Sequence, residues 1–95
     1  MDTEIERKIV DNIRRYGAEG ILVERVTLGS QDDLSKGKGR NGYSVRTIDS
    51  LSHRSFPHST RMVCNLEAHN FEESMRLISR VARSNGLALA NKAEV

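Results

Sequence analysis

Hydrophobic side chains near the N-terminal end recur every four residues. Ile5, Ile9 and Ile13 form one row, and Tyr16 extends it before a glycine. This spacing is typical of an amphipathic helix with one buried face. Glycine is also common just past the end of a helix. The pattern therefore predicts a helix from Thr3 to Tyr16.

A second helical pattern lies near the other end of the chain. Its apolar positions are Phe71, Met75, Ile78, Val81 and Ala82. Their spacing favours a helix with one face toward a core. Asn70 stands where a capping side chain is expected, and the Asn-Gly pair at 85–86 is a typical helix end.

Three segments between these helices favour β-strands. They are ILVERVTL at 21–28, YSVRTIDSL at 43–51 and TRMVCNLEA at 60–68. The third alternates most clearly, with Met62, Cys64 and Leu66 on one face. LALA at 87–90 is consistent with a short fourth edge strand. The order predicts an α+β fold, α-β-β-β-α, in which two helices cover one face of a three-stranded antiparallel sheet.

Composition adds an expectation about assembly and location. We expect residues 1–90 to form one domain and 91–95 a frayed tail. Only 37% of the residues are hydrophobic and Cys64 is the single cysteine, so no internal disulfide can support the small core. We therefore expect a homo-oligomer that associates through the uncovered sheet face. A lone cysteine and the lack of an apolar run of about 18 residues favour a cytoplasmic protein without membrane contact.

The segment 29–42 contains little apolar material besides Leu34, which predicts a long loop. Gly37, Gly39 and Gly42 form a G-x-G-x-x-G pattern within it. In a dinucleotide-binding fold such glycines follow a strand directly and open a helix, whereas Gly42 leads into a predicted strand. Two interpretations remain: a mobile hairpin connection, or a flexible basic loop that contacts phosphates.

Positive charge gathers in two places although the net charge is only +2. Residues 36–61 hold six lysines and arginines against Asp49 alone. Arg76, Arg80 and Arg83 fall on one side of the second predicted helix. They form either a solvated face, partly neutralised by Glu72 four residues before Arg76, or a basic stripe beside the loop that follows a nucleic-acid backbone.

This charge placement favours a non-enzymatic binding module for nucleic acid, RNA above all, or for another phosphate-bearing ligand. Tyr43, at the loop exit, is a candidate to stack on a base. The predicted phosphate-contacting and base-contacting residues are Lys36, Lys38, Arg40, Tyr43, Arg46, Arg76, Arg80 and Arg83.

The alternative is a small accessory or inhibitor protein, of the type that phages and mobile elements encode. Such a protein binds and blocks or sequesters a protein or small-molecule partner. Leu34 and Phe56 are apolar residues within polar loops, and they would be its contact anchors. Its binding would depend weakly on salt.

Metal binding and catalysis have weaker support in the sequence. The side chains with metal-ligand chemistry are His53, His58, Cys64 and His69. None of them shows the close paired spacing of zinc sites, and Cys64 shares a strand face with apolar neighbours, as a structural thiol does. We therefore expect no enzyme activity, metal or cofactor.

The element order from Thr3 to Gly86 is similar to that of the double-stranded-RNA-binding domain. That family opens its second helix with a lysine cluster that grips phosphates. The matching segment here, HNFEES at 69–74, is acidic. The resemblance is therefore one of element order, which many unrelated small α+β domains share, and the chain is not assigned to that family.

Overall fold

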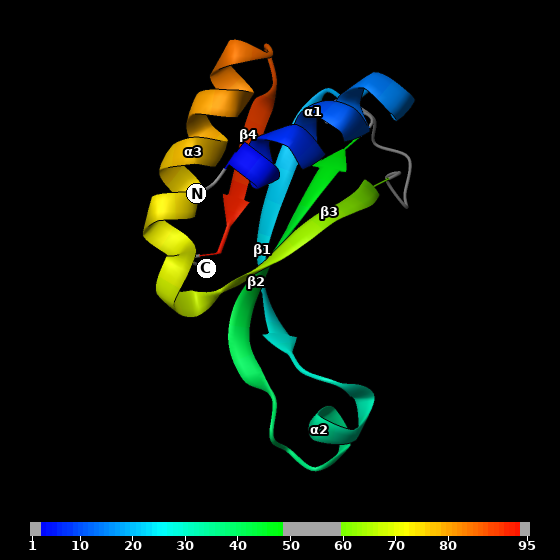
Figure 1. Cartoon of the computed structure of the whole chain (residues 1–95), viewed down its shortest axis with the longest axis vertical. Coiled ribbons are helices and arrows are strands. Elements are labelled where there is room, and N and C mark those ends of the chain that lie inside the picture. Colours follow the sequence, from blue (N-terminus) through cyan, green and yellow to red (C-terminus); the bar gives the residue numbers. More distant parts are fainter. Residues whose placement is uncertain (1–2, 49–59, 94–95) are drawn as a thin grey trace.

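The computed structural model describes residues 3–48 and 60–93. In chain order its elements are α1 (Thr3–Tyr16), β1 (Gly20–Leu28), α2 (Gln31–Ser35), β2 (Arg40–Ile48), β3 (Thr60–Glu67), the short 3-10 helix η1 (Ala68–Asn70), α3 (Phe71–Ser84) and β4 (Ala88–Lys92). The predicted α+β class is confirmed, together with both long helices, three strands and the short fourth strand (Figure 1).

The four strands form one sheet in the order β3-β2-β1-β4. β1 pairs antiparallel with β2, and β2 pairs antiparallel with β3, as predicted. β4 pairs parallel with β1, so it runs in the same direction as β3. Parallel strands need a long crossover connection, and α3 supplies it between β3 and β4.

The core lies between one face of this sheet and the two long helices. Its buried members are Ile9, Ile21, Val23, Val45, Leu66, Leu77, Ile78, Val81, Ala82 and Ala93. On α3 the buried face also includes Ser74, whereas Phe71 and Met75 are only half-buried. The face that α3 turns to the core is therefore rotated relative to the prediction, which leaves Phe71 and Met75 at its margin.

The C-terminal end of the described chain belongs to the sheet. The sequence predicted a frayed tail from residue 91, but β4 continues through Lys92 and the side chain of Ala93 is buried. The Ala93 N–H donates a hydrogen bond to the side-chain oxygen of Asn91 at 3.0 Å. Asn91 is thus part of β4 and lines a pocket together with residues of α3.

The predicted long loop is in fact an ordered hairpin end. α2 lies within residues 29–42, and β2 begins at Arg40. Ser30 and Asp33 form a reciprocal capping box at the start of α2, which satisfies backbone N–H groups that would otherwise lack partners. The hairpin extends well beyond α1 and α3 (Figure 1).

The alternation predicted for β3 is interrupted by a bulge. Cys64 pairs with Val45 and Met62 pairs with Arg46, so Val63 has no residue opposite it. A bulge adds one residue to one strand and resets which side chains share a face. Val63 and Cys64 both pack against the core while Met62 is 43% exposed; the prediction that Met62 and Cys64 share one face is wrong.

The sheet face opposite the helices carries the half-buried side chains of Leu22 and Val26 on β1. The expected self-association through this face stays a prediction. Within residues 3–48 and 60–93, every helix is too short or too polar to span a membrane.

Candidate functional site

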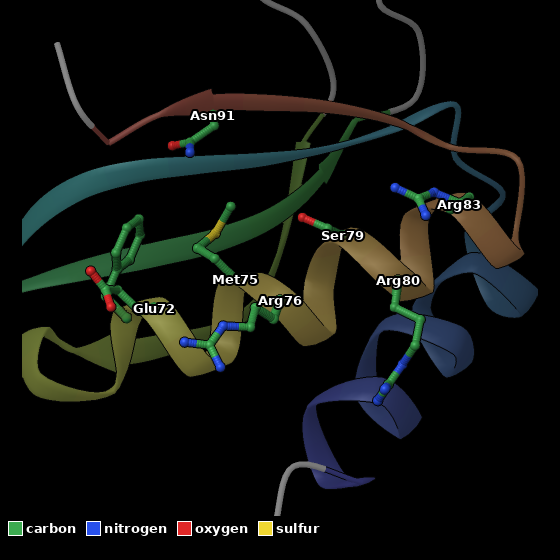
Figure 2. A pocket seen from close by; sticks show the side chains of 8 residues that line it. Glu72, Met75, Arg76, Ser79, Arg80, Arg83 and Asn91 are labelled. Atoms are coloured by element: carbon green, nitrogen blue, oxygen red, sulfur yellow. The ribbon is translucent and has the colours of Figure 1, made fainter.

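A shallow groove lies between α3 and the edge strand β4 (Figure 2). Its volume is about 620 Å³. The residues that line it are Phe71, Glu72, Met75, Arg76, Ser79, Arg80, Arg83 and Asn91. The groove therefore combines two apolar side chains, three cations, one carboxylate and two neutral polar side chains within a short stretch of surface.

Three arginines of the groove form a row along α3. Arg76, Arg80 and Arg83 follow one another at intervals of four and three residues, which places them on the same side of a helix. With a rise of about 1.5 Å per residue, the row covers ~10 Å of helix. Figure 2 shows that the three side chains leave α3 in different directions, Arg83 toward the strands and Arg80 toward α1, and do not converge on one point. This arrangement suits an extended anion better than one small ion.

These arginines carry charge that the described residues do not neutralise. No ion pair joins Arg76, Arg80 or Arg83 to a carboxylate of residues 3–48 or 60–93. Glu72, which the sequence offered as a partner for Arg76, lines the groove without such a pair. All three arginines are solvent-exposed, so their guanidinium groups are available to an external anion.

The cations of the hairpin are in a different state. Lys36 pairs with Asp32 at 3.2 Å, one turn earlier in α2. Arg40 pairs with Glu67 of β3 at 2.8 Å. Lys38 is exposed and has no ion pair among the described residues. Two of the three loop cations predicted to contact phosphates are thus already engaged within the protein.

The three glycines of the G-x-G-x-x-G pattern have structural reasons to be glycine. Gly37 has a φ of +70° at the end of α2, a conformation that side-chain-bearing residues avoid. A Cβ on Gly39 would lie 2.9 Å from the Leu34 side chain, and one on Gly42 would lie 2.7 Å from the Leu66 carbonyl oxygen. Chain geometry accounts for the pattern without a bound phosphate.

The remaining two predicted residues lie elsewhere. Arg46 is half-buried on β2, and its Nη1 donates a hydrogen bond to the Thr60 hydroxyl at 3.5 Å. Tyr43 stacks on Phe71, with ring centroids 4.0 Å apart and ring planes 31° apart. Tyr43 therefore supports Phe71, which itself lines the groove. The eight predicted residues do not form one patch, because the hairpin and α3 lie apart (Figure 1).

The Arg40–Glu67 pair predicts a pH effect on stability. Arg40 donates hydrogen bonds to the Glu67 carboxylate, which lowers the pKa of Glu67. Because unfolding restores the ordinary pKa, about 4.3, the contribution is complete above that pH and is lost as the pH falls through the lower folded value. We expect Glu67→Gln to lose stability at pH 7 and to approach wild type in urea unfolding as the pH falls well below about 4.3. A difference between the two proteins that does not change with pH would contradict this.

Cys64 lacks the environment of a nucleophile. Burial raises the pKa of its thiol, and the positive charge of Lys8 offsets this only in part. We expect Ellman's reagent to modify Cys64 several-fold more slowly in the folded protein than in urea, because the reactive form is the thiolate. Equal rates in both conditions would instead indicate an exposed, activated thiol.

The structure describes two of the four residues considered for a metal site. Cys64 is half-buried and His69 is exposed in η1, while His53 and His58 lie outside the described residues. Residues 3–48 and 60–93 contain no group of three histidine, cysteine or carboxylate side chains that could hold a metal ion.

Sequence reasoning did not select several residues that line the groove. Phe71 and Met75 were assigned only to the apolar face of their helix, and Asn91 was placed in a tail. The signal for Phe71 and Met75 was present, because a buried stripe through Ser74 and Leu77 leaves positions 71 and 75 at its edge. The signal for Asn91 was absent, since its position depends on the parallel pairing of β4.

Comparison of the chain with protein-family models, curated proteins and solved structures found no match.

Proposed function

We propose that this protein is a small non-enzymatic binding module that holds a phosphate-bearing chain, RNA above all, along α3. The observation that carries the proposal is the row of Arg76, Arg80 and Arg83, exposed and without a carboxylate partner among the described residues. In this proposal the main phosphate contacts are made by α3 and not by the hairpin, because Lys36 and Arg40 of the hairpin are paired internally.

Three neighbouring cations on one helix face repel one another weakly in water. A ligand with regularly spaced negative charges removes that repulsion and gains hydrogen bonds from each guanidinium. Arginine can donate two parallel hydrogen bonds to one phosphate. A nucleic-acid backbone offers such charges in sequence, so it matches a row better than a single small anion does.

The polar groups of the groove support RNA in particular. Ser79 and Asn91 line the groove beside the arginines. Their hydroxyl and amide groups both donate and accept hydrogen bonds, as the RNA 2′-hydroxyl does. Proteins use contacts to this hydroxyl to distinguish RNA from DNA.

The test is fluorescence anisotropy with short labelled RNA and DNA oligonucleotides at several salt concentrations. Three phosphate contacts to a single strand predict a slope of about −2 in a plot of log affinity against log salt. RNA is expected to bind more tightly than DNA of the same sequence. Absence of binding at low salt for every oligonucleotide would refute the proposal.

A second candidate function rests on the hairpin. Leu34 is 46% exposed in α2, at the end of a projection held by the capping box of Ser30 and Asp33. An exposed apolar side chain on an ordered projection suits contact with a protein, as an accessory or inhibitor protein requires. Phe56, the other expected anchor, lies outside the described residues. A partner held by Leu34 would bind with little salt dependence and would be lost in Leu34→Asp.

A further inference from the structure

We infer that the α3–β4 groove takes single-stranded RNA and not a duplex, with one base against Phe71 and Met75 and the following phosphates along the arginine row. This inference rests on the proposed function and specifies that the RNA ligand is single-stranded. It depends on how the apolar and charged side chains are distributed along the groove.

The apolar part of the groove is confined to one end. Phe71 begins α3 and Met75 follows one turn later. Both side chains are half-buried, because they lie beside the buried face of the helix and not within it. Tyr43 stacks on Phe71 at a centroid distance of 4.0 Å, so the position of the Phe71 ring is set within the protein. A ring held in place and a polarisable thioether together provide a surface on which a base can lie.

The charges determine which part of the ligand lies at which end of the groove. Phe71 and Glu72 are the first two residues of α3 and both line the groove, and Arg76, Arg80 and Arg83 follow later along the same helix. Figure 2 shows Glu72 at one end of the groove and Arg83 near the other. A phosphate beside Glu72 would meet a like charge, whereas a neutral base would not. The favourable arrangement therefore places the base at Phe71 and Met75 and the phosphates from Arg76 onward.

A duplex cannot place a base face against Phe71 and Met75 and phosphates along the arginine row at the same time. Its base faces are stacked inside the helix, and it presents phosphates and base edges to a protein. The apolar end of the groove would then face charged backbone. A single strand can turn one base face to Phe71 while its backbone continues along α3, since unstacked bases stack readily on aromatic side chains.

The test compares a labelled single-stranded RNA with a duplex of the same length and sequence. Wild-type protein should bind the single strand at least tenfold more tightly. Met75→Ala should weaken single-strand binding about fivefold or more without changing the salt slope. Phe71→Leu should also weaken single-strand binding. This variant loses the ring contact with Tyr43 and could unfold, in which case Met75→Ala still tests the inference. Met62→Ala, a methionine truncation at an exposed position on β3, is the matched control.

The outcomes separate this inference from the function on which it rests. Equal affinity for single strand and duplex, or unchanged binding by Met75→Ala, would overturn the inference. If that binding were still salt-sensitive and dependent on the arginines, the proposed function would stand. Lack of binding to either RNA would overturn both.

Discussion

Replacing Arg76, Arg80 and Arg83 together by glutamine is expected to abolish salt-sensitive binding of single-stranded RNA. Glutamine preserves helix propensity and much of the side-chain length, but it removes the three charges that line the α3–β4 groove. With a slope of about −0.7 per contacted phosphate, the dependence on salt should disappear with the affinity. Fluorescence anisotropy between 50 and 200 mM salt measures both, and wild-type affinity should fall about twentyfold over that range.

The matched control is the triple variant Lys36→Gln, Lys38→Gln and Arg40→Gln. It removes the same amount of charge from the hairpin, where Lys36 and Arg40 pair with Asp32 and Glu67. We expect it to retain most of the affinity and the salt slope. The arginine variant should remain folded, because exposed side chains without partners contribute little to stability. Loss of binding in the hairpin variant alone would transfer the phosphate site to the hairpin.

Gly42→Ala is expected to destabilise the protein by roughly 3 kcal/mol, the upper part of the range for overpacking. The added Cβ would lie 2.6 Å from Leu28 Cγ and 2.7 Å from the Leu66 carbonyl oxygen. The carbonyl belongs to the backbone of the neighbouring strand, so a rotamer change cannot relieve the overlap. A loss of this size lowers the melting temperature by more than 10 °C in a domain of about this length. Urea and thermal unfolding followed by circular dichroism measure it.

Gly37→Ala distinguishes backbone strain from steric overlap. Gly37 has a φ of +70° with open space where a Cβ would stand, so only the left-handed conformation costs energy, about 1–2 kcal/mol.

A double-mutant cycle tests the overlap at Gly42. Leu28→Ala should lower the free energy of unfolding less in the Gly42→Ala background than in wild type, because removing the Leu28 side chain relieves part of the overlap. If Gly37→Ala and Gly42→Ala lowered the free energy of unfolding equally, and Gly42→Ala showed no coupling to Leu28→Ala, steric overlap at Gly42 would be ruled out.

Local periodicity was enough to predict most of the fold. The rows of isoleucines in α1 and of apolar residues in α3 have helical spacing, and α1 has the predicted bounds Thr3–Tyr16. Three successive strands imply an antiparallel meander because short connections join antiparallel neighbours. α2 also had a signal that the composition of the loop obscured, since Ser30 with Asp33 three residues later is a capping pattern.

The features that sequence reasoning missed depend on contacts between distant segments. The bulge at Val63 and the parallel pairing of β4 with β1 arise from how strands meet in the sheet. The Arg40–Glu67 pair joins residues 27 positions apart. In contrast, the Lys36–Asp32 pair was visible as an i,i+4 spacing.

The candidate site was predictable only in part for the same reason. Helical spacing alone placed Arg76, Arg80 and Arg83 on one side of α3. The sequence pattern did not reveal that the hairpin projects away from that helix, so the two basic segments were expected to be neighbours (Figure 1). Nor did it reveal that Asn91 of β4 forms the opposite wall of the groove.

An NMR titration of isotope-labelled protein with a short single-stranded RNA would locate the RNA on the surface of the protein. Binding along α3 predicts that chemical-shift changes concentrate at residues 71–83 and at Asn91, with the guanidinium Nε–H signals of Arg76, Arg80 and Arg83 among the largest. Signals of α2 and residues 36–42 should change little. Shift changes centred on the hairpin, or none at any RNA concentration, would exclude RNA binding along α3.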